Sequence, residues 1–280
     1  SGLRKCNSMA ARLNRHQTPN FDCKLMTTLK VTLQSRKIRI EERLKTHGIS
    51  ETSISFLRYL MFDEKEFATP YEVGCRIIVI YAIAFTIEEQ TKKQSVVDWL
   101  KRESIWEKVG YREAQYLEGN ETEEEQINDF SWQMEGAYIL AWTLNLIKEP
   151  PSPKVPVDEK QIEHFCSTVP PLGTKLGDFL GNLNFRKTEE IFEENILYEL
   201  TTAYFRDLLF SGKEDSTEIN RIAAFERHKA LNWLRRYMYQ RMGRDRHFYL
   251  NRQNGYFRRQ QPTVHCQNPG RTEVIQHWGA

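Results

Sequence analysis

Two charged side chains lie in stretches that are otherwise apolar, and they are the best candidates for chemistry in this chain. Glu135 is the one acid between Phe130 and Ile147, FSWQMEGAYILAWTLNLI, and a helical wheel places it beside Trp142. Near the C-terminus, Glu226 falls in the middle of the apolar face of a second helix, with Arg227 at the edge of that face. An unpaired buried charge costs several kcal/mol. We therefore expect Glu135 and Arg227 to meet in the interior if these two helices pack together.

This pairing has two interpretations. It is either a structural ion pair between two core helices, or it contains a buried acid tuned by desolvation for ligand binding or proton transfer. Glu226 has the same two interpretations, and two neighbouring carboxylates would suit acid–base chemistry. The candidate polar site consists of Glu135, Glu226, Arg227, His228, Asn232, Trp132 and Trp142.

His228 and Asn232 project from the other side of the last helix as an i, i+4 pair. We interpret them as a solvated or capping pair, with a ligand-facing pair across a groove as the alternative. No histidine in the helices has a second His or Cys at metal-ligand spacing, so no metal site and no cofactor are predicted. The five cysteines form no CxxC pair and are odd in number, which indicates reduced thiols in a cytoplasm.

The stretch from Phe130 to Ile147 also determines the predicted fold. Its apolar side chains surround the helical wheel, and a helix that is apolar all round is buried on every side. No alternating strand pattern of useful length occurs elsewhere, although a small hairpin in the 173–187 loop stays open. We therefore predict an all-α fold, a single globular multi-helix domain built around this buried central helix.

Capping and breaking residues predict the other helices. Thr69-Pro70-Tyr71-Glu72 has the residues of a capping box with proline at the first helical position, and Pro150-Pro151 should end the central helix. Ser211-Gly212 should end another helix. Helices are expected near residues 32–47, 70–89, 95–100, 111–117, 158–167, 188–209 and 216–239, besides the central one.

The distribution of charge divides the chain into three parts. Residues 1–30 hold six Lys/Arg against one Asp, and residues 241–280 hold seven against two acids, so each end has a net charge of +5. Since the whole chain is +2, residues 31–240 have a net charge of −8. We interpret 1–30 as a disordered or adventitious segment and 31–240 as the helical domain. A hinge is predicted near 149–157, where proline is frequent.

Several of these motifs resemble the bacterial proteins grouped as domain of unknown function 4272. The nine residues ERHKALNWL (226–234) are the most specific, and WQMEGAYILAWTL (132–144) is similar to the family's W-x-x-E-A-x-x-x-L-x-W pattern. REAQYL (112–117) and RIEERLKTHGI (39–49) extend the resemblance to about residues 33–240. Gly136 departs from the family's usual alanine. The resemblance implies a soluble helical bacterial protein and implies no activity.

The chain after Gln240 departs from that family, which tends to finish with an acidic segment beginning Trp-Asp. Codons compatible with Met242 to Tyr249 spell Trp-Asp-Glu-Ile-Asp-Thr-Phe when they are read one base later. Our hypothesis is that residues 241–280 are an out-of-frame translation or a disordered tail. The basic C-terminal segment then indicates nothing about partners, and nucleic-acid binding, which depends on the two basic ends, ranks third.

Two functions remain from these observations. The leading hypothesis is a protein-interaction module, an acidic helical protein that binds another protein, with an immunity-type protein neutralising a basic toxin as one form of it. The alternative is an enzyme or small-ligand binder with a polar site between the central and last helices. The longest uncharged apolar run, Gly136–Ile147, is too short to cross a bilayer, and no signal peptide is expected, so we predict a cytoplasmic protein without a membrane partner. The sequence leaves the oligomeric state open.

Overall fold

The computed structural model describes residues 19–50, 52–119 and 123–236, with the side chains from Leu29 onward. These residues form helices and connecting loops and contain no strand, so the predicted all-α class is confirmed. The α-helices are α1 (Pro19–Thr46), α2 (Pro70–Glu88), α3 (Lys93–Arg102), α4 (Tyr111–Glu118), α5 (Glu124–Thr143), α6 (Glu159–Thr168), α7 (Gly177–Gly181), α8 (Thr188–Ser211) and α9 (Arg221–Leu234). Short 3-10 turns η1 (Leu57–Leu60), η2 (Glu64–Glu66), η3 (Gln90–Lys92) and η4 (Trp106–Lys108) lie between them.

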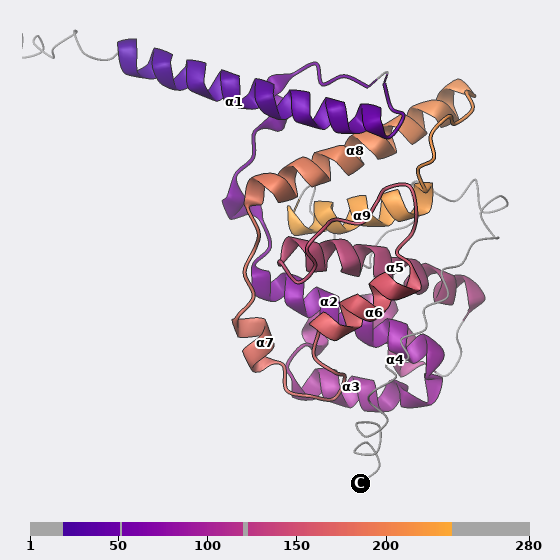
Figure 1. The fold of residues 1–280 in the computed structure, drawn as a ribbon. Coiled ribbons are helices and arrows are strands. Elements are labelled where there is room, and N and C mark those ends of the chain that lie inside the picture. Colours follow the sequence, from indigo (N-terminus) through magenta and orange to yellow (C-terminus); the bar gives the residue numbers. More distant parts are fainter. Residues whose placement is uncertain (1–18, 51, 120–122, 237–280) are drawn as a thin grey trace, which may run out of the picture.

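The helices stack in successive layers with α5 near the centre (Figure 1). α5 packs on α9 on one side and on α2 on the other, and α8 covers the far side of α9. α1 lies across α8 at one end of the stack, and α3 and α4 lie at the other end. Because α9 is packed between α5 and α8, side chains on both of its faces are removed from water.

The central helix is buried as predicted, but it is shorter than expected. From Phe130 to Thr143 every residue except Ser131 is buried. The helix ends at Thr143, before the expected Ile147, and Asn145 adopts a left-handed φ of 59°. Arg186 stabilises this end, since its backbone N–H donates to the carbonyl of Thr143 and its Nε donates to the carbonyl of Trp142 at 2.6 Å. These bonds satisfy carbonyl groups that a helix C-terminus leaves unpaired.

α2 confirms the strongest capping prediction. Thr69 accepts from the Glu72 N–H while the Glu72 carboxylate accepts from the Thr69 N–H, so both halves of the capping box are present. α2 is also the one helix among the described residues that is long and apolar enough to span a membrane, and most of it is buried inside the protein. Its burial against α5 accounts for its Ile- and Val-rich sequence.

Four other boundaries correct the sequence-based expectations. α1 begins at Pro19, earlier than the expected start near Thr32, because proline suits the first helical turn and no helix breaker follows it. α3 begins at Lys93, ahead of the expected cap Ser95. The 173–187 loop contains the short helix α7 and no hairpin.

The start of the last helix is the fourth correction. α9 begins at Arg221, after the expected Ser216, and Asn220 caps it by accepting from the Ala223 N–H at 2.9 Å. The preceding loop is held out of the helix because the Asp215 carboxylate accepts from the N–H of Thr217. The expected helix end, Tyr239, and the predicted tail 241–280 lie outside the described residues.

Candidate functional site

The predicted contact between the central and last helices is confirmed. The Nε and Nη2 atoms of Arg227 donate to Oε2 of Glu135 at 2.9 and 2.6 Å. Both side chains are withdrawn from water, with 0% of the Arg227 side chain and 1% of the Glu135 side chain exposed. The ion pair joins α5 to α9 in the dry interior.

The remaining N–H groups of Arg227 bind a proline-rich segment, residues 149–157, which we call the strap. Nη1 donates to the carbonyl of Ser152 at 2.6 Å and to the hydroxyl of Tyr198 at 3.1 Å, and Nη2 donates to the carbonyl of Val155 at 3.0 Å. Thus all five N–H groups of the guanidinium are in use. The strap's Val157 N–H donates to the other oxygen of Glu135 at 2.8 Å.

Other residues also fasten the strap. The Tyr198 hydroxyl donates to the carbonyl of Pro151 at 3.3 Å, and the Asn220 N–H donates to the carbonyl of Pro153 at 3.1 Å. The prediction that residues 149–157 are a hinge stays a prediction. In this conformation the segment is bound to α5, α8 and α9 through buried polar groups.

The electrostatics of this cluster follow from its burial. Burial raises the pKa of the Glu135 carboxyl, against the charge of Arg227 and the Val157 N–H, which lower it. Burial likewise raises the pKa of the Tyr198 hydroxyl to about 12. Neither carboxylate oxygen of Glu135 and no N–H of Arg227 is free to bind a ligand, so the geometry favours the structural interpretation of the pair.

His228 and Asn232 belong to a hydrogen-bonded chain between α8 and α9, so their interpretation as a solvated or capping pair is corrected. The hydroxyl of Thr202 donates to the Glu199 carbonyl, so Nδ1–H of His228 donates to the Thr202 oxygen at 2.9 Å. Asn232 then donates to Nε2 of His228 at 2.8 Å. Asn232 is buried and His228 is half-buried, because α8 covers the face of α9 from which they project.

The same chain continues on α8 and fixes the protonation state of the histidine. Asn195 donates to the side-chain oxygen of Asn232 at 2.8 Å, and Arg235 donates to Asn195. With Asn232 donating to it, Nε2 of His228 has no place for a proton. Burial, assisted by the charge of Arg235, lowers the pKa of His228 to about 4.

The other three predicted residues have separate surroundings. Glu226 is buried and pairs with Lys229 one turn along α9; its charge adds to the raised pKa of Glu135, but no hydrogen bond joins the two carboxylates. Trp132 is buried. Trp142 is 3% exposed, and the guanidinium of Arg186 lies over its ring at 4.0 Å from the centroid.

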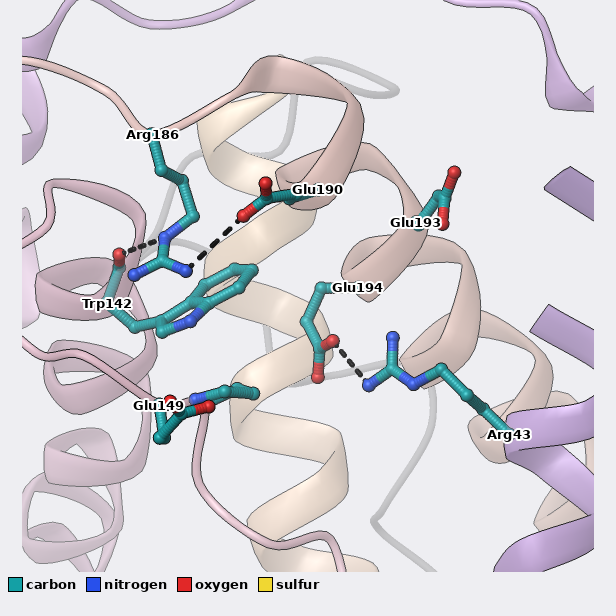
Figure 2. Close-up of a pocket in the computed structure, with 8 residues that line it drawn as sticks. Arg43, Trp142, Glu149, Arg186, Glu190, Glu193 and Glu194 are labelled. Atoms are coloured by element: carbon teal, nitrogen blue, oxygen red, sulfur yellow. Dashed lines mark hydrogen bonds and ion pairs between the residues drawn. The ribbon is translucent and has the colours of Figure 1, made fainter. Parts of the chain in front are cut away.

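Trp142 lines a pocket that sequence reasoning did not predict (Figure 2). The pocket has a volume of about 370 Å³ and opens to solvent between α1, α8 and the start of the strap. We call it the glutamate pocket. Its lining residues are Arg43, Trp142, Glu149, Pro150, Arg186, Glu190, Glu193 and Glu194.

A second buried ion pair was also missed. Arg76 of α2 donates through both terminal nitrogens to the carboxylate of Glu113 on α4, at 2.8 and 2.5 Å, and to Gln133 of α5 at 3.2 Å. Burial alone would raise the pKa of Glu113, but the charge and hydrogen bonds of Arg76 and the Gly110 N–H outweigh it, so the pKa is lowered. The Gly110 N–H donates to Glu113 at 2.7 Å, which is the half of a capping box that glycine permits, and an acid at this third helical position was the one signal in the sequence that could have located the carboxylate.

The described residues contain no group of three His, Cys, Asp or Glu side chains placed to hold a metal ion. Cys75 on α2 and Cys166 on α6 are buried, and neither forms a disulfide with a described residue. Burial raises the pKa of the Cys75 thiol, which disfavours the nucleophilic thiolate. The polar groups of the Glu135–Arg227 cluster therefore bind one another, whereas the glutamate pocket is open to solvent.

These features define a class: an all-helical domain with a buried central helix, internal ion pairs and a charged surface pocket. The family model described as domain of unknown function (DUF4272) matches residues 36–243, and the chain belongs to that family. The matched range includes all the motifs of the central and last helices and the whole glutamate pocket. Comparisons with curated proteins and with solved structures gave no match.

Proposed function

We propose that this protein is a protein-interaction module that binds a basic segment of another protein at the glutamate pocket. The supporting observation is the composition of the pocket, which brings four carboxylates from α8 and the strap to one opening with two guanidiniums. Residues 31–240 have a net charge of −8, so the surrounding surface attracts a cationic partner over a longer range. An immunity-type protein that neutralises a basic toxin is one form of this proposal.

The geometry gives less support to an enzyme or ligand site between α5 and α9. Every polar atom of the Glu135–Arg227 pair has a partner within the protein, and neither side chain reaches solvent. A substrate there would have to displace the strap. The pocket, in contrast, is open and retains carboxylates with unused hydrogen-bonding capacity.

The proposal is tested by isothermal titration of the full chain with a ten-residue peptide of alternating arginine and glycine. We expect binding that weakens as salt is raised, and no binding of the matching glutamate peptide. The double variant Glu149→Gln/Glu190→Gln should lose most of the affinity. The control Glu159→Gln/Glu163→Gln removes the same charge from exposed positions of α6, away from the pocket, and should bind as the wild type does. Equal losses in both double variants, or no binding by the wild type, would overturn the proposal.

A further inference from the structure

Two of the four carboxylates in the glutamate pocket already have partners on α1. Glu193 accepts from Arg39, and Glu194 accepts from Nη2 of Arg43 at 2.6 Å. Glu149 lines the pocket and forms no hydrogen bond or ion pair with any described residue, although its charge acts on the guanidinium of Arg186. The carboxylate of Glu149 on the strap is therefore not neutralised by a described partner, whereas the two carboxylates next to α1 are.

The negative charge of Glu190 is only weakly neutralised by its cationic neighbour, Arg186. Its carboxylate lies 3.6 Å from Nη1 of Arg186, and the other nitrogens of that guanidinium donate to the carbonyls of Trp142, Ile147 and Lys148. Glu149 and Glu190 come from two different elements, the strap and α8, and both line the pocket, on opposite sides of the Trp142 ring (Figure 2). Glu149 is the acceptor that the described part of the pocket leaves most available.

Trp142 supplies an independent indication of a ligand. Its indole N–H is buried and has no hydrogen-bond acceptor among the described residues, although the side chain is 97% withdrawn from water. Figure 2 shows this indole in the middle of the pocket, with its N–H edge turned toward the Glu149 side. A buried donor without a partner costs free energy, and a carbonyl oxygen brought by a bound peptide would satisfy it.

We infer that the glutamate pocket receives one arginine side chain of the partner, together with a main-chain carbonyl of the same segment; this inference rests on the proposed function. The guanidinium is a planar fork of N–H donors, so two of its N–H groups can bond both oxygens of the Glu149 carboxylate, and the negative charge of Glu190 adds to the attraction. A lysine ammonium is a compact point charge and cannot form these two parallel bonds to one carboxylate. The indole N–H of Trp142 donates to the carbonyl of the bound segment.

The test compares three peptides of the same length, in which arginine alternates with glycine and is then replaced throughout by lysine or by uncharged citrulline. We expect the lysine peptide to bind at least fivefold more weakly than the arginine peptide and the citrulline peptide to show no binding. Equal affinity of the arginine and lysine peptides would overturn the arginine assignment while leaving the proposed function intact. No binding of either basic peptide would instead overturn the proposed function.

The role of Trp142 is tested by Trp142→Phe, which removes the N–H and keeps an aromatic ring. We expect this variant to bind the arginine peptide about tenfold more weakly, and the wild type to show a peptide-induced change in tryptophan fluorescence that the variant lacks. Trp233→Phe, on α9 and outside the pocket lining, is the matched control and should keep both the affinity and the signal. Because Trp142→Phe also changes the packing of a buried side chain, Glu149→Gln at an exposed position provides a second readout and should also weaken binding about tenfold. Full affinity in both variants would overturn the inference.

Discussion

The guanidinium of Arg227 binds the carboxylate of Glu135 through two nitrogens, although 92 positions separate them in the sequence. The same guanidinium holds the carbonyls of Ser152 and Val155, so a single side chain joins α5, α9 and the strap. The strap begins with Glu149 and Pro150, which form one wall of the glutamate pocket. The buried pair thus supports the pocket from the interior without being part of it.

Glu135→Gln should strongly destabilise the protein. The substitution leaves the Arg227 charge buried without its counter-ion, and breaking a buried pair in this way costs about 3 to 5 kcal/mol. The unfolding free energy from urea denaturation measures the loss, with Glu163→Gln on the exposed face of α6 as the control. An unfolding midpoint equal to that of the wild type would mean that the pair is not structural.

Tyr198→Phe should also lower the unfolding free energy, but by less than Glu135→Gln does. It removes the hydroxyl that accepts from Arg227 and donates to the carbonyl of Pro151 while the ring stays in place. Leaving one buried N–H of the guanidinium without a partner costs about 1 to 3 kcal/mol. Faster hydrogen exchange across residues 149–157 should accompany the loss, because the strap loses one of its attachments. A variant with unchanged exchange in the strap would contradict this role for the hydroxyl.

His228 should make the protein less stable in mild acid. Its pKa is lowered from 6.5 to about 4 in the folded state, so above pH 6.5 the side chain is neutral in both the folded and unfolded states. As the pH falls from 6.5 toward 4, the unfolded chain binds a proton that the folded chain excludes, and the unfolding free energy decreases. The full decrease is at most about 3 kcal/mol. Urea denaturation at several pH values should show a flatter profile over this range in His228→Gln, and parallel profiles for the two proteins would refute the assignment.

Arg76→Lys should reveal the importance of the second buried pair. An ammonium group cannot reproduce the two parallel bonds that the guanidinium makes to Glu113. We expect a loss of about 2 kcal/mol in the unfolding free energy, within the range for hydrogen bonds to charged groups. Arg58→Lys, in the short turn η1, keeps the charge outside a buried pair and should change stability little. An Arg76→Lys variant as stable as the wild type would show that the fork geometry is unimportant.

Much of the fold could be predicted because local signals and burial agree. The stretch around Trp142 is apolar on every side, and such a helix has no stable place except the interior. The Thr69–Glu72 capping box specifies the start of α2 through contacts within four residues. The start of α9 was missed because Ser216 has the chemistry of a cap, whereas the turn made by Asp215 and the cap at Asn220 prevail.

The site was harder to predict because it depends on which faces are covered. A helical wheel with one buried face put Arg227 at its edge and His228 in solvent. α9 is covered by both α5 and α8, so Arg227 is fully buried and His228 is bonded to α8. The glutamate pocket combines α1, α8 and the strap, and no pattern along the sequence indicates that Glu149 and Glu190 share an opening.

We propose that the buried Glu135–Arg227 pair stabilises the fold and that the exposed carboxylate of Glu149 binds the partner, and Glu149→Gln tests this separation most directly. The unfolding free energy and the affinity for the alternating arginine–glycine peptide should be measured on the same preparation. We predict an unfolding free energy within about 0.5 kcal/mol of the wild type, as for a surface substitution, and an affinity about tenfold lower. Unchanged affinity, or a loss of stability that accounts for the weaker binding, would contradict the account.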